Sequence, residues 1–317
     1  MKILITGATG FIGKRLTAKL LEKGFEINVL TRDKQKAKKL FPQEKVLVFA
    51  WKNNLELPPI EAFEGISGII NLKGENIGDH RWSKNQKKKF KESRVDSTIN
   101  LVKQIEQTLK SPLNFFIQAS AVGIYPVNTK KVSTEDDDLG TGFLAELCKK
   151  WEGATASLTK AKRKVIIRNG IVLEKNGGVL KKMHLPFKLG IGGPIGNGNQ
   201  MISWIHLDDL VNIYANAIDD ERFVGVINAM APTPVSNFDF TKALGHALHR
   251  PTLIPIPKLV LKIVLGEMAS IILESQMVTS KRLLDLNFYF QYPTVDKALN
   301  AIFERKEKAP AMLRTTT

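Results

Sequence analysis

A glycine-rich turn close to the start of the chain has the spacing of a phosphate-binding loop. It reads TGATGFIG over residues 6–13 and directly follows the apolar run 3–5. Gly7 permits a tight turn, Gly10 lets backbone N–H groups approach a pyrophosphate, and Gly13 allows a helix to pack closely on the strand. The N–H groups at the start of that helix would face the negative charge. A strand before the turn and an amphipathic helix after it favour a dinucleotide-binding site over a purely structural strand–helix turn.

The end of the second apolar run indicates which dinucleotide would bind. Proteins that use NAD normally place Asp or Glu there to bind the ribose 2′-hydroxyl. In this chain the run 27–30 is followed by Thr31, Arg32 and Asp33. A hydroxyl and a guanidinium at positions 31 and 32 suit a 2′-phosphate, because Arg makes charge-assisted, often bidentate contacts. We therefore predict NADP, with NADPH favoured over NADH, and expect Asp33 to cap the next helix.

The elements that must position these residues follow from a regular alternation in the first half of the chain. Short runs that are apolar on both faces, as in buried parallel strands, alternate with amphipathic stretches of helical period. The runs are 3–5, 27–30, 46–49, 69–72, 115–117 and 165–167. This alternation predicts an α/β fold, a Rossmann-type doubly wound parallel sheet.

The second half of the chain has a different texture. Residues 174–200 are rich in glycine and predict a long loop with one or two helical turns, and a short strand follows at 226–228. From residue 238 the pattern is mainly helical. We therefore predict an NAD(P)-binding domain over 1–220 and a smaller helical C-terminal lobe over 238–300 that contributes to the substrate cleft. The tail after Glu304 has little apolar content and is expected to fray.

Composition excludes several classes of protein. Of the 317 residues 43% are hydrophobic and 25% charged, which excludes bulk disorder. A single cysteine excludes a disulfide framework, no metal-ligand spacing connects the five histidines, and no apolar run reaches membrane-spanning length. The first strand leads straight into the glycine turn and leaves no room for a signal peptide. We expect a cytoplasmic protein without a bound metal.

The charge balance is strongly basic. Lys and Arg number 47 against 31 Asp and Glu, a net charge of +16. Such a balance suits anionic partners, but the lysines are dispersed and the only dense run is 84–91. A solvated basic face is favoured over a nucleic-acid patch. We expect a small-molecule substrate, no specific nucleic acid and no membrane partner, while the oligomeric state, a homodimer included, stays open.

Motifs spread over nearly the whole chain resemble one known group of proteins. They include GATGFIG, INLKGENI, SRVDST, QASAVGIYP, GFLAELCKKWE, RNGIVL and PFKLGIGGPIGNGNQMISWIHLDDL. In this order they resemble an atypical branch of the extended short-chain dehydrogenase/reductases. Members of this branch are named epimerase-family or NAD-dependent epimerase/dehydratase proteins, and some are labelled cell-division inhibitors. The resemblance supplies no physiological substrate.

The resemblance implies a set of cofactor contacts. It assigns Gly7, Thr9, Gly10, Phe11, Ile12 and Gly13 to the pyrophosphate loop, Thr31 and Arg32 to the 2′-phosphate, and Leu72, Lys73 and Gly74 to the side of the adenosine and pyrophosphate. Lys73 replaces a small residue and either contacts a phosphate or points to solvent. Arg94 is either a further cation near the cofactor or a solvated helix residue.

The resemblance fails at the catalytic residues. Active members of the superfamily use a Ser or Thr together with Tyr-x-x-x-Lys to move the proton that accompanies hydride transfer. Ser120 supplies a hydroxyl at the end of a strand and is the predicted catalytic residue, but Leu144 stands at the tyrosine position and Cys148 at the lysine position. Lys149 is one residue off, about 100° around the helix.

Three other polar residues near the predicted cleft can each be interpreted in two ways. Tyr125 is a wall of the substrate pocket or a replacement base, and Cys148 is packing or a nucleophile. Glu75 is an acid or base, or caps a helix. Asp208 or Asp209 is expected to cap the helix that follows, and His206 to be structural.

Two functions remain in competition. The first is an NADP-dependent oxidoreductase or epimerase with an altered proton route, and the second is a non-catalytic NADPH-binding sensor or interaction protein. A third interpretation, a basic nucleic-acid-binding protein with a vestigial cofactor domain, has less support.

Overall fold

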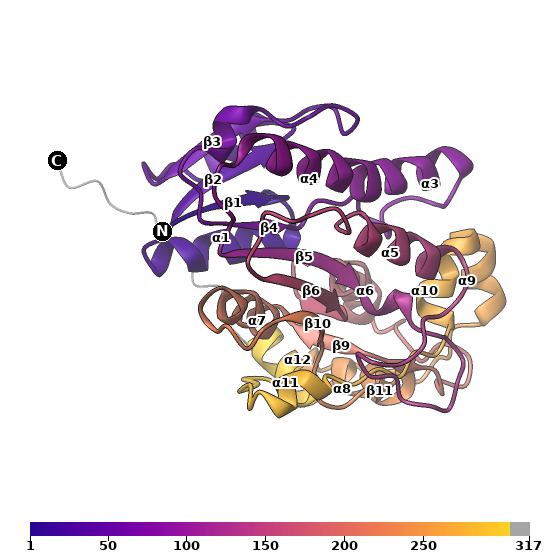
Figure 1. Ribbon diagram of the computed structural model, residues 1–317. Coiled ribbons are helices and arrows are strands. Elements are labelled where there is room, and N and C mark those ends of the chain that lie inside the picture. The colour runs from indigo at the N-terminus through magenta and orange to yellow at the C-terminus, as the bar shows by residue number, and fades with distance from the viewer. Residues whose placement is uncertain (305–317) are drawn as a thin grey trace.

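A seven-stranded parallel sheet forms the centre of the molecule (Figure 1). The computed structural model describes residues 1–304. The strand order is β10-β6-β5-β4-β1-β2-β3, and every neighbouring pair is parallel. The strands are β1 (Lys2–Thr6), β2 (Glu26–Thr31), β3 (Val46–Ala50), β4 (Gly68–Asn71), β5 (Phe115–Ala121), β6 (Lys164–Asn169) and β10 (Gly225–Ala229). The predicted Rossmann-type fold is confirmed. The order reverses between β1 and β4, which is where such sheets bind ligands.

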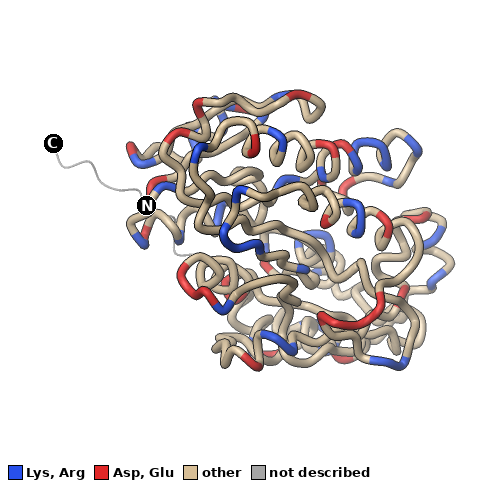
Figure 2. Tube along the Cα trace, viewed as in Figure 1, with Lys and Arg blue, Asp and Glu red and all other residues tan. Residues whose placement is uncertain are grey.

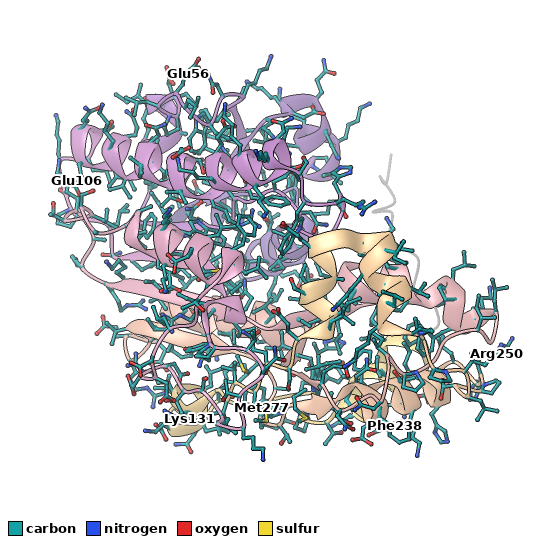
Figure 3. The ribbon with its side chains drawn as sticks, turned by 90° about the vertical axis from the view of Figure 1, so that its right-hand side faces the viewer. Glu56, Glu106, Lys131, Phe238, Arg250 and Met277 are labelled. Atoms are coloured by element: carbon teal, nitrogen blue, oxygen red, sulfur yellow. The ribbon has the colours of Figure 1, made fainter. Side chains whose placement is uncertain are left out.

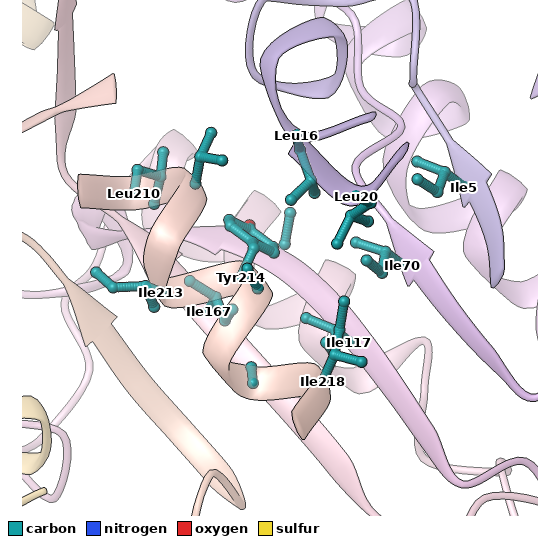
Figure 4. Close-up of a cluster of buried hydrophobic side chains, with 14 of the residues drawn as sticks. Ile5, Leu16, Leu20, Ile70, Ile117, Ile167, Leu210, Ile213, Tyr214 and Ile218 are labelled. Carbon is teal, nitrogen blue, oxygen red and sulfur yellow. The ribbon is translucent and has the colours of Figure 1, made fainter. Parts of the chain in front are cut away.

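Alternating side chains of the strands supply the cores on the two faces of the sheet. Ile3 and Ile5 belong to one buried cluster and Leu4 to another, as a strand period of two requires. On the first face, α1 (Phe11–Glu22) packs beside α7 (Leu207–Asp219). The side chains that meet there are Leu16 and Leu20 of α1, Leu210, Ile213, Tyr214 and Ile218 of α7, and Ile5, Ile70, Ile117 and Ile167 of the sheet (Figure 4).

The opposite face is covered by a long helical segment that contains an irregular turn. It consists of α3 (Lys84–Lys91), a π-helical turn (Glu92–Asp96) and α4 (Ser97–Thr108) in direct succession. Leu101 and Ile105 of α4 pack against the sheet. Single π-helical turns within α-helices are frequent at functional sites. The remaining helices of this half are α2 (Lys34–Leu40), whose N-terminus is capped by Asp33 as predicted, and α5 (Phe143–Gly153).

The glycine-rich segment 174–200 contains more helix than the sequence predicts. Instead of one or two turns, α6 (Gly178–Lys188) runs for 11 residues. The glycines of the segment lie at the start of this helix and beyond its end, and both Gly178, its first residue, and Gly190 adopt positive φ. Between them, Leu180 and Phe187 are seven residues apart and both buried, so one face of the helix packs on the core.

The C-terminal part is mainly helical, as predicted, through residue 304. Its helices are α8 (Asn237–Ala247), α9 (Lys258–Leu265), α10 (Ser270–Leu273), α11 (Lys281–Asp285) and α12 (Val295–Glu304). Two small sheets connect it to the rest: β7 (Ile171–Glu174) pairs with β9 (Trp204–His206), and β8 (Met201–Ile202) pairs with β11 (Val235–Ser236). Strand β10 lies between the predicted domains 1–220 and 238–300, and that division stays a prediction. The tail after Glu304, predicted to fray, lies outside the described residues.

Positive charge is spread over the described part of the chain. Lys and Arg alternate with Asp and Glu along the trace (Figure 2). Within the basic run 84–91, Lys88 pairs with Glu92, Lys91 with Asp96, and Lys87 with Glu267. No helix within residues 1–304 combines the length and apolar character needed to cross a membrane.

The start of α7 anchors the C-terminal lobe to the sheet domain. His206, not Asp208 or Asp209, caps α7: its Nδ1 accepts a hydrogen bond from the N–H of Asp208 at 3.0 Å. Asp209 is fully buried and accepts hydrogen bonds from the backbone N–H groups of Gln291 and Tyr292, each at 2.9 Å. The capping prediction is wrong because the second carboxylate is needed elsewhere, to pair backbone groups that would otherwise be buried without partners.

Replacing Asp209 by Ala should lower the free energy of unfolding by roughly 3 kcal/mol, because the buried N–H of Tyr292 and the partly buried N–H of Gln291 lose their acceptor. Asp208→Ala is the matched control, since that carboxylate pairs with the half-exposed Arg15 at the surface. Urea denaturation of both variants measures the difference. Equal losses would show that Asp209 does not hold the lobe in place.

Candidate functional site

The glycine loop sits tightly against the end of the neighbouring strand. Gly7 has φ +71, and a Cβ there would lie 2.8 Å from the carbonyl carbon of Leu72, just after β4. A Cβ on Gly13 would overlap the carbonyl oxygen of Gly7. The N–H of Gly10 donates to the same oxygen at 2.9 Å and closes the turn. These contacts confirm the tight turn at Gly7 and the close packing at Gly13, while the approach of a pyrophosphate at Gly10 stays a prediction.

A cleft of about 140 Å³ opens beside this loop at the carboxyl ends of the strands. Its lining includes the predicted cofactor residues Gly7, Thr9, Gly10, Thr31, Arg32, Leu72, Lys73 and Gly74. Phe11, Ile12 and Gly13 do not line it: the side chains of Phe11 and Ile12 pack against the core, and Gly13 lies beneath the turn. The sequence analysis missed Leu30, Trp51, Asn54 and Ser93, which also line the cleft. Trp51 directly follows β3, at the edge of the sheet where ligands bind, and this position in the sequence could have identified it as a residue of the cleft.

Lys73 lies inside the cleft. Its Nζ is 3.2 Å from the centre of the Trp51 ring, and it is buried without a hydrogen-bond partner among the described residues. Burial, and then the positive charge of Arg32, lowers the pKa of Lys73 to about 7. A buried ammonium without a carboxylate partner is costly. The geometry therefore favours the predicted phosphate contact over the solvent-directed alternative.

Arg94 lies in the π-helical turn and lines a second, larger cavity. Its guanidinium carbon is 5.1 Å from the centre of the Trp151 ring, and a Cβ on Gly74 would be 2.9 Å from it. The Nη1 atom is buried without a hydrogen-bond partner within residues 1–304, and burial lowers the pKa of Arg94 to about 10. Arg94 is thus not a solvated helix residue, and its guanidinium lies beside Gly74 of the cleft.

The larger cavity has a volume of about 410 Å³ and lies between the sheet domain and the C-terminal lobe. Its wall comes from the end of β5 and from α5, α6 and α10, and includes Ala121, Leu144 and Cys148. The positions at which the superfamily carries tyrosine and lysine therefore face the cavity, but with a leucine and a thiol. Burial raises the pKa of Cys148 to about 11, so the thiol is protonated at neutral pH and is no nucleophile.

Ser120, the predicted catalytic hydroxyl, does not reach this cavity. Side chains alternate along β5, so Ala121 lines the cavity while Ser120 points into the protein and is 2% exposed. Its Oγ donates to Glu152 Oε1 at 2.6 Å. The predicted catalytic role of Ser120 therefore has no support in the structure.

Ser120 belongs to a buried network that also holds Tyr125. Glu152 accepts hydrogen bonds from two nitrogens of Arg168, at 2.9 and 2.8 Å. The hydroxyl of Tyr125 accepts from Arg168 at 2.6 Å and donates to Asn228 at 2.8 Å. Burial raises the pKa of Tyr125. Tyr125 lines the cavity, which agrees with its interpretation as a wall of the substrate pocket. Its hydroxyl is unsuited to the alternative role of a base.

The carboxylates near the site are distributed differently from the prediction. Glu75 lines the small cleft, where it lies 3.4 Å from Arg32, and it does not line the cavity. Glu274, which the sequence analysis did not single out, lines the cavity, and burial raises its pKa. The fold of the C-terminal lobe brings Glu274 to the cavity wall, and no local sequence motif indicates this position.

Together, the parallel sheet and the glycine loop at its switch point define a protein of the Rossmann type. Residues 3–145 match the NAD dependent epimerase/dehydratase family, and residues 256–302 match a domain of unknown function (DUF1731).

Relatives match over nearly the full length. The chain is 39% identical to the Arabidopsis thaliana epimerase family protein SDR39U1 homolog, chloroplastic, over 96% of this chain and 87% of that protein. It is 34% identical to mouse SDR39U1, over 95% and 99%. The structure of human SDR39U1 (isoform 2) with NADPH is 33% identical, covers 96% of this chain and 100% of that chain, and superposes with a TM-score of 0.84. The chain therefore belongs to the epimerase family of SDR39U1-type proteins.

The buried network of Ser120, Glu152, Arg168 and Tyr125 should stabilise the fold. Substitutions of two glutamates in α5 can test this expectation. Glu152→Ala leaves the guanidinium of Arg168, 5% exposed, without its carboxylate and should cost about 3–5 kcal/mol of unfolding free energy. Glu146→Ala, the control, removes an exposed pair with Lys149 and should leave the urea midpoint nearly unchanged. Similar midpoints for both variants would contradict the structural role of the network.

Proposed function

We propose that this protein binds NADP(H) and uses it for hydride transfer to or from a small molecule held in the larger cavity. The observation that carries the proposal is a pair of buried cations that lack hydrogen-bond partners among the described residues: Lys73 in the small cleft and Arg94 at the wall of the larger cavity. Buried donors without partners indicate a ligand that supplies acceptors. A dinucleotide phosphate would supply acceptors to Lys73, and the molecule held in the larger cavity would supply one to Arg94.

The residues of the cleft suit each part of this cofactor. The loop at Gly7 and Gly10 would hold the pyrophosphate at the start of α1. Thr31, Arg32 and Lys73 line the same cleft and would bind the 2′-phosphate. The human relative crystallised with NADPH supports this assignment. The reactive end would then extend past Arg94 into the cavity.

The proposed reaction needs a proton route unlike that of the superfamily. When bound, NADPH would supply a hydride to a carbonyl carbon, and the carbonyl oxygen would gain a proton to give an alcohol and NADP⁺. Leu144 has no acidic proton, and Cys148 lacks the lysine that assists the tyrosine of the superfamily, so the proton would come from water, while Arg94 would stabilise the negative charge that develops on the oxygen.

A non-catalytic NADPH sensor is the second candidate. It is favoured by the same replacements at the cavity wall, where Ala121, Leu144 and Cys148 offer no proton donor of the usual kind.

Cofactor preference tests the proposed site. NADPH should bind at least tenfold more tightly than NADH, about 1.4 kcal/mol, and Arg32→Asp should reverse the order because a carboxylate repels the phosphate and accepts from the ribose hydroxyl. Isothermal titration calorimetry measures both affinities. Lys38→Asp on the neighbouring helix controls for the change in net charge. Equal affinities of the unmutated protein for the two cofactors would refute the 2′-phosphate site.

The lowered pKa of Lys73 predicts a pH dependence. Without ligand the side chain loses its proton as the pH rises through about 7. A bound phosphate favours the ammonium form, so binding takes up a proton, and NADPH affinity should fall by about tenfold or more between pH 7 and 9. The 2′-phosphate itself, with a pKa of about 6, is already ionised in this range.

Replacing Lys73 by Met should flatten this profile, whereas Lys52→Met, at a neighbouring exposed position, should leave it unchanged. Calorimetry in buffers of different ionisation enthalpy would measure the proton uptake directly. A steep profile that persists in Lys73→Met would assign the titration to another group.

A further inference from the structure

The wall of the larger cavity is dominated by apolar side chains. They come from loops and helices that are far apart in the sequence and include Ile77, Val179, Met183, Ile202, Ile271 and Ile272. Binding pockets of this kind recognise a ligand mainly by burying its apolar surface, and a few polar groups fix its orientation.

Most polar side chains of the wall already bond within the protein. Besides Tyr125, the side-chain oxygen of Asn237 accepts from the N–H of Ile195 at 2.7 Å. The amide of Gln276 donates to the carbonyl oxygen of Val122 at 2.7 Å, and Ser203 donates to that of Gln276 at 2.9 Å. These groups stabilise the wall rather than face a ligand.

Arg94, which belongs to the same wall, differs from them because its Nη1 is buried and lacks a hydrogen-bond partner within the described chain. A sugar nucleotide would bring many hydroxyls into contact with the apolar surface, and each unpaired group would cost about 1–3 kcal/mol. A molecule with one acceptor oxygen avoids this cost.

We infer that the ligand of the larger cavity is a small, mainly apolar ketone or aldehyde whose oxygen accepts a hydrogen bond from Arg94, and not a sugar nucleotide. This inference rests on the proposed function for the position of the cofactor. It names the class of substrate that the wall selects, and it makes Arg94 the residue that recognises the reacting oxygen.

The hairpin of α9 and α10 offers a matched pair of variants. It faces the viewer in Figure 3 as two adjacent helices. Ile271 of α10 lines the cavity, whereas Ile263 of α9 is 66% exposed on the same hairpin. An Asp at position 271 places a charge on the apolar wall, and an Asp at 263 places it in solvent.

The test uses 4-phenyl-2-butanone, an apolar ketone, with butylbenzene as the hydrocarbon that lacks the oxygen and UDP-glucose as the sugar nucleotide. Binding to the protein saturated with NADP⁺ is followed by calorimetry. The ketone should bind at least tenfold more tightly than UDP-glucose. Ile271→Asp should weaken ketone binding at least tenfold, and Ile263→Asp less than twofold.

Arg94→Met should lower the affinity for the ketone to that for butylbenzene without changing the affinity for butylbenzene. UDP-glucose binding as tightly as the ketone, or ketone binding that tolerates Ile271→Asp, would overturn the inference. The same titrations on cofactor-free protein keep this test separate from the proposed function. If the ketone binds as described but its addition causes no loss of NADPH absorbance, hydride transfer to this ketone fails while the ligand class stands.

Discussion

The small cleft depends on glycines that let the loop after β1 pack directly against the end of β4. Gly7 lies so close to Leu72 that any Cβ would be 2.8 Å from its carbonyl carbon, and Gly13 leaves no more room beneath the turn. Both faces of the sheet are covered by helices, so exposed polar groups can gather only at the ends of the strands. The tight loop at this edge brings the start of α1 beside the ends of β2, β3 and β4, and thereby forms the cleft.

The small cleft and the larger cavity each hold a buried cation whose side chain lacks a carboxylate partner among the described residues. Lys73 rests on Trp51, and Arg94 lies near Trp151, so aromatic rings occupy the positions where carboxylates would normally pair with buried cations. Such an arrangement is unfavourable in the unliganded protein, since desolvation lowers the pKa of both side chains. It becomes favourable when an anionic ligand binds, which is why perturbed cations of this kind mark functional sites.

The larger cavity departs from the superfamily in chemistry but not in position. Ala121, Leu144 and Cys148 lie where proton-transferring groups would be expected, and the buried hydroxyls nearby serve the packing of the protein. Ser120, Glu152, Arg168 and Tyr125 form a network that satisfies its members internally. Buried polar networks of this kind stabilise a fold when every member has a partner. The consequence is a cavity whose shape is rigidly supported and whose surface is mainly apolar.

The strands, the glycine loop, the cap at Asp33 and most of the lining of the small cleft were predictable because each depends on a local period or on a motif within a few residues. The outcome at Ser120 was not, because a one-residue change in position along β5 reverses the direction of a side chain, and only the structure shows that Ala121 is the residue facing the cavity. The helix within 174–200, the cap at His206 and the approach of Glu274 also required the tertiary structure. Each is decided by contacts between segments far apart in the chain, and such contacts leave no local pattern in the sequence.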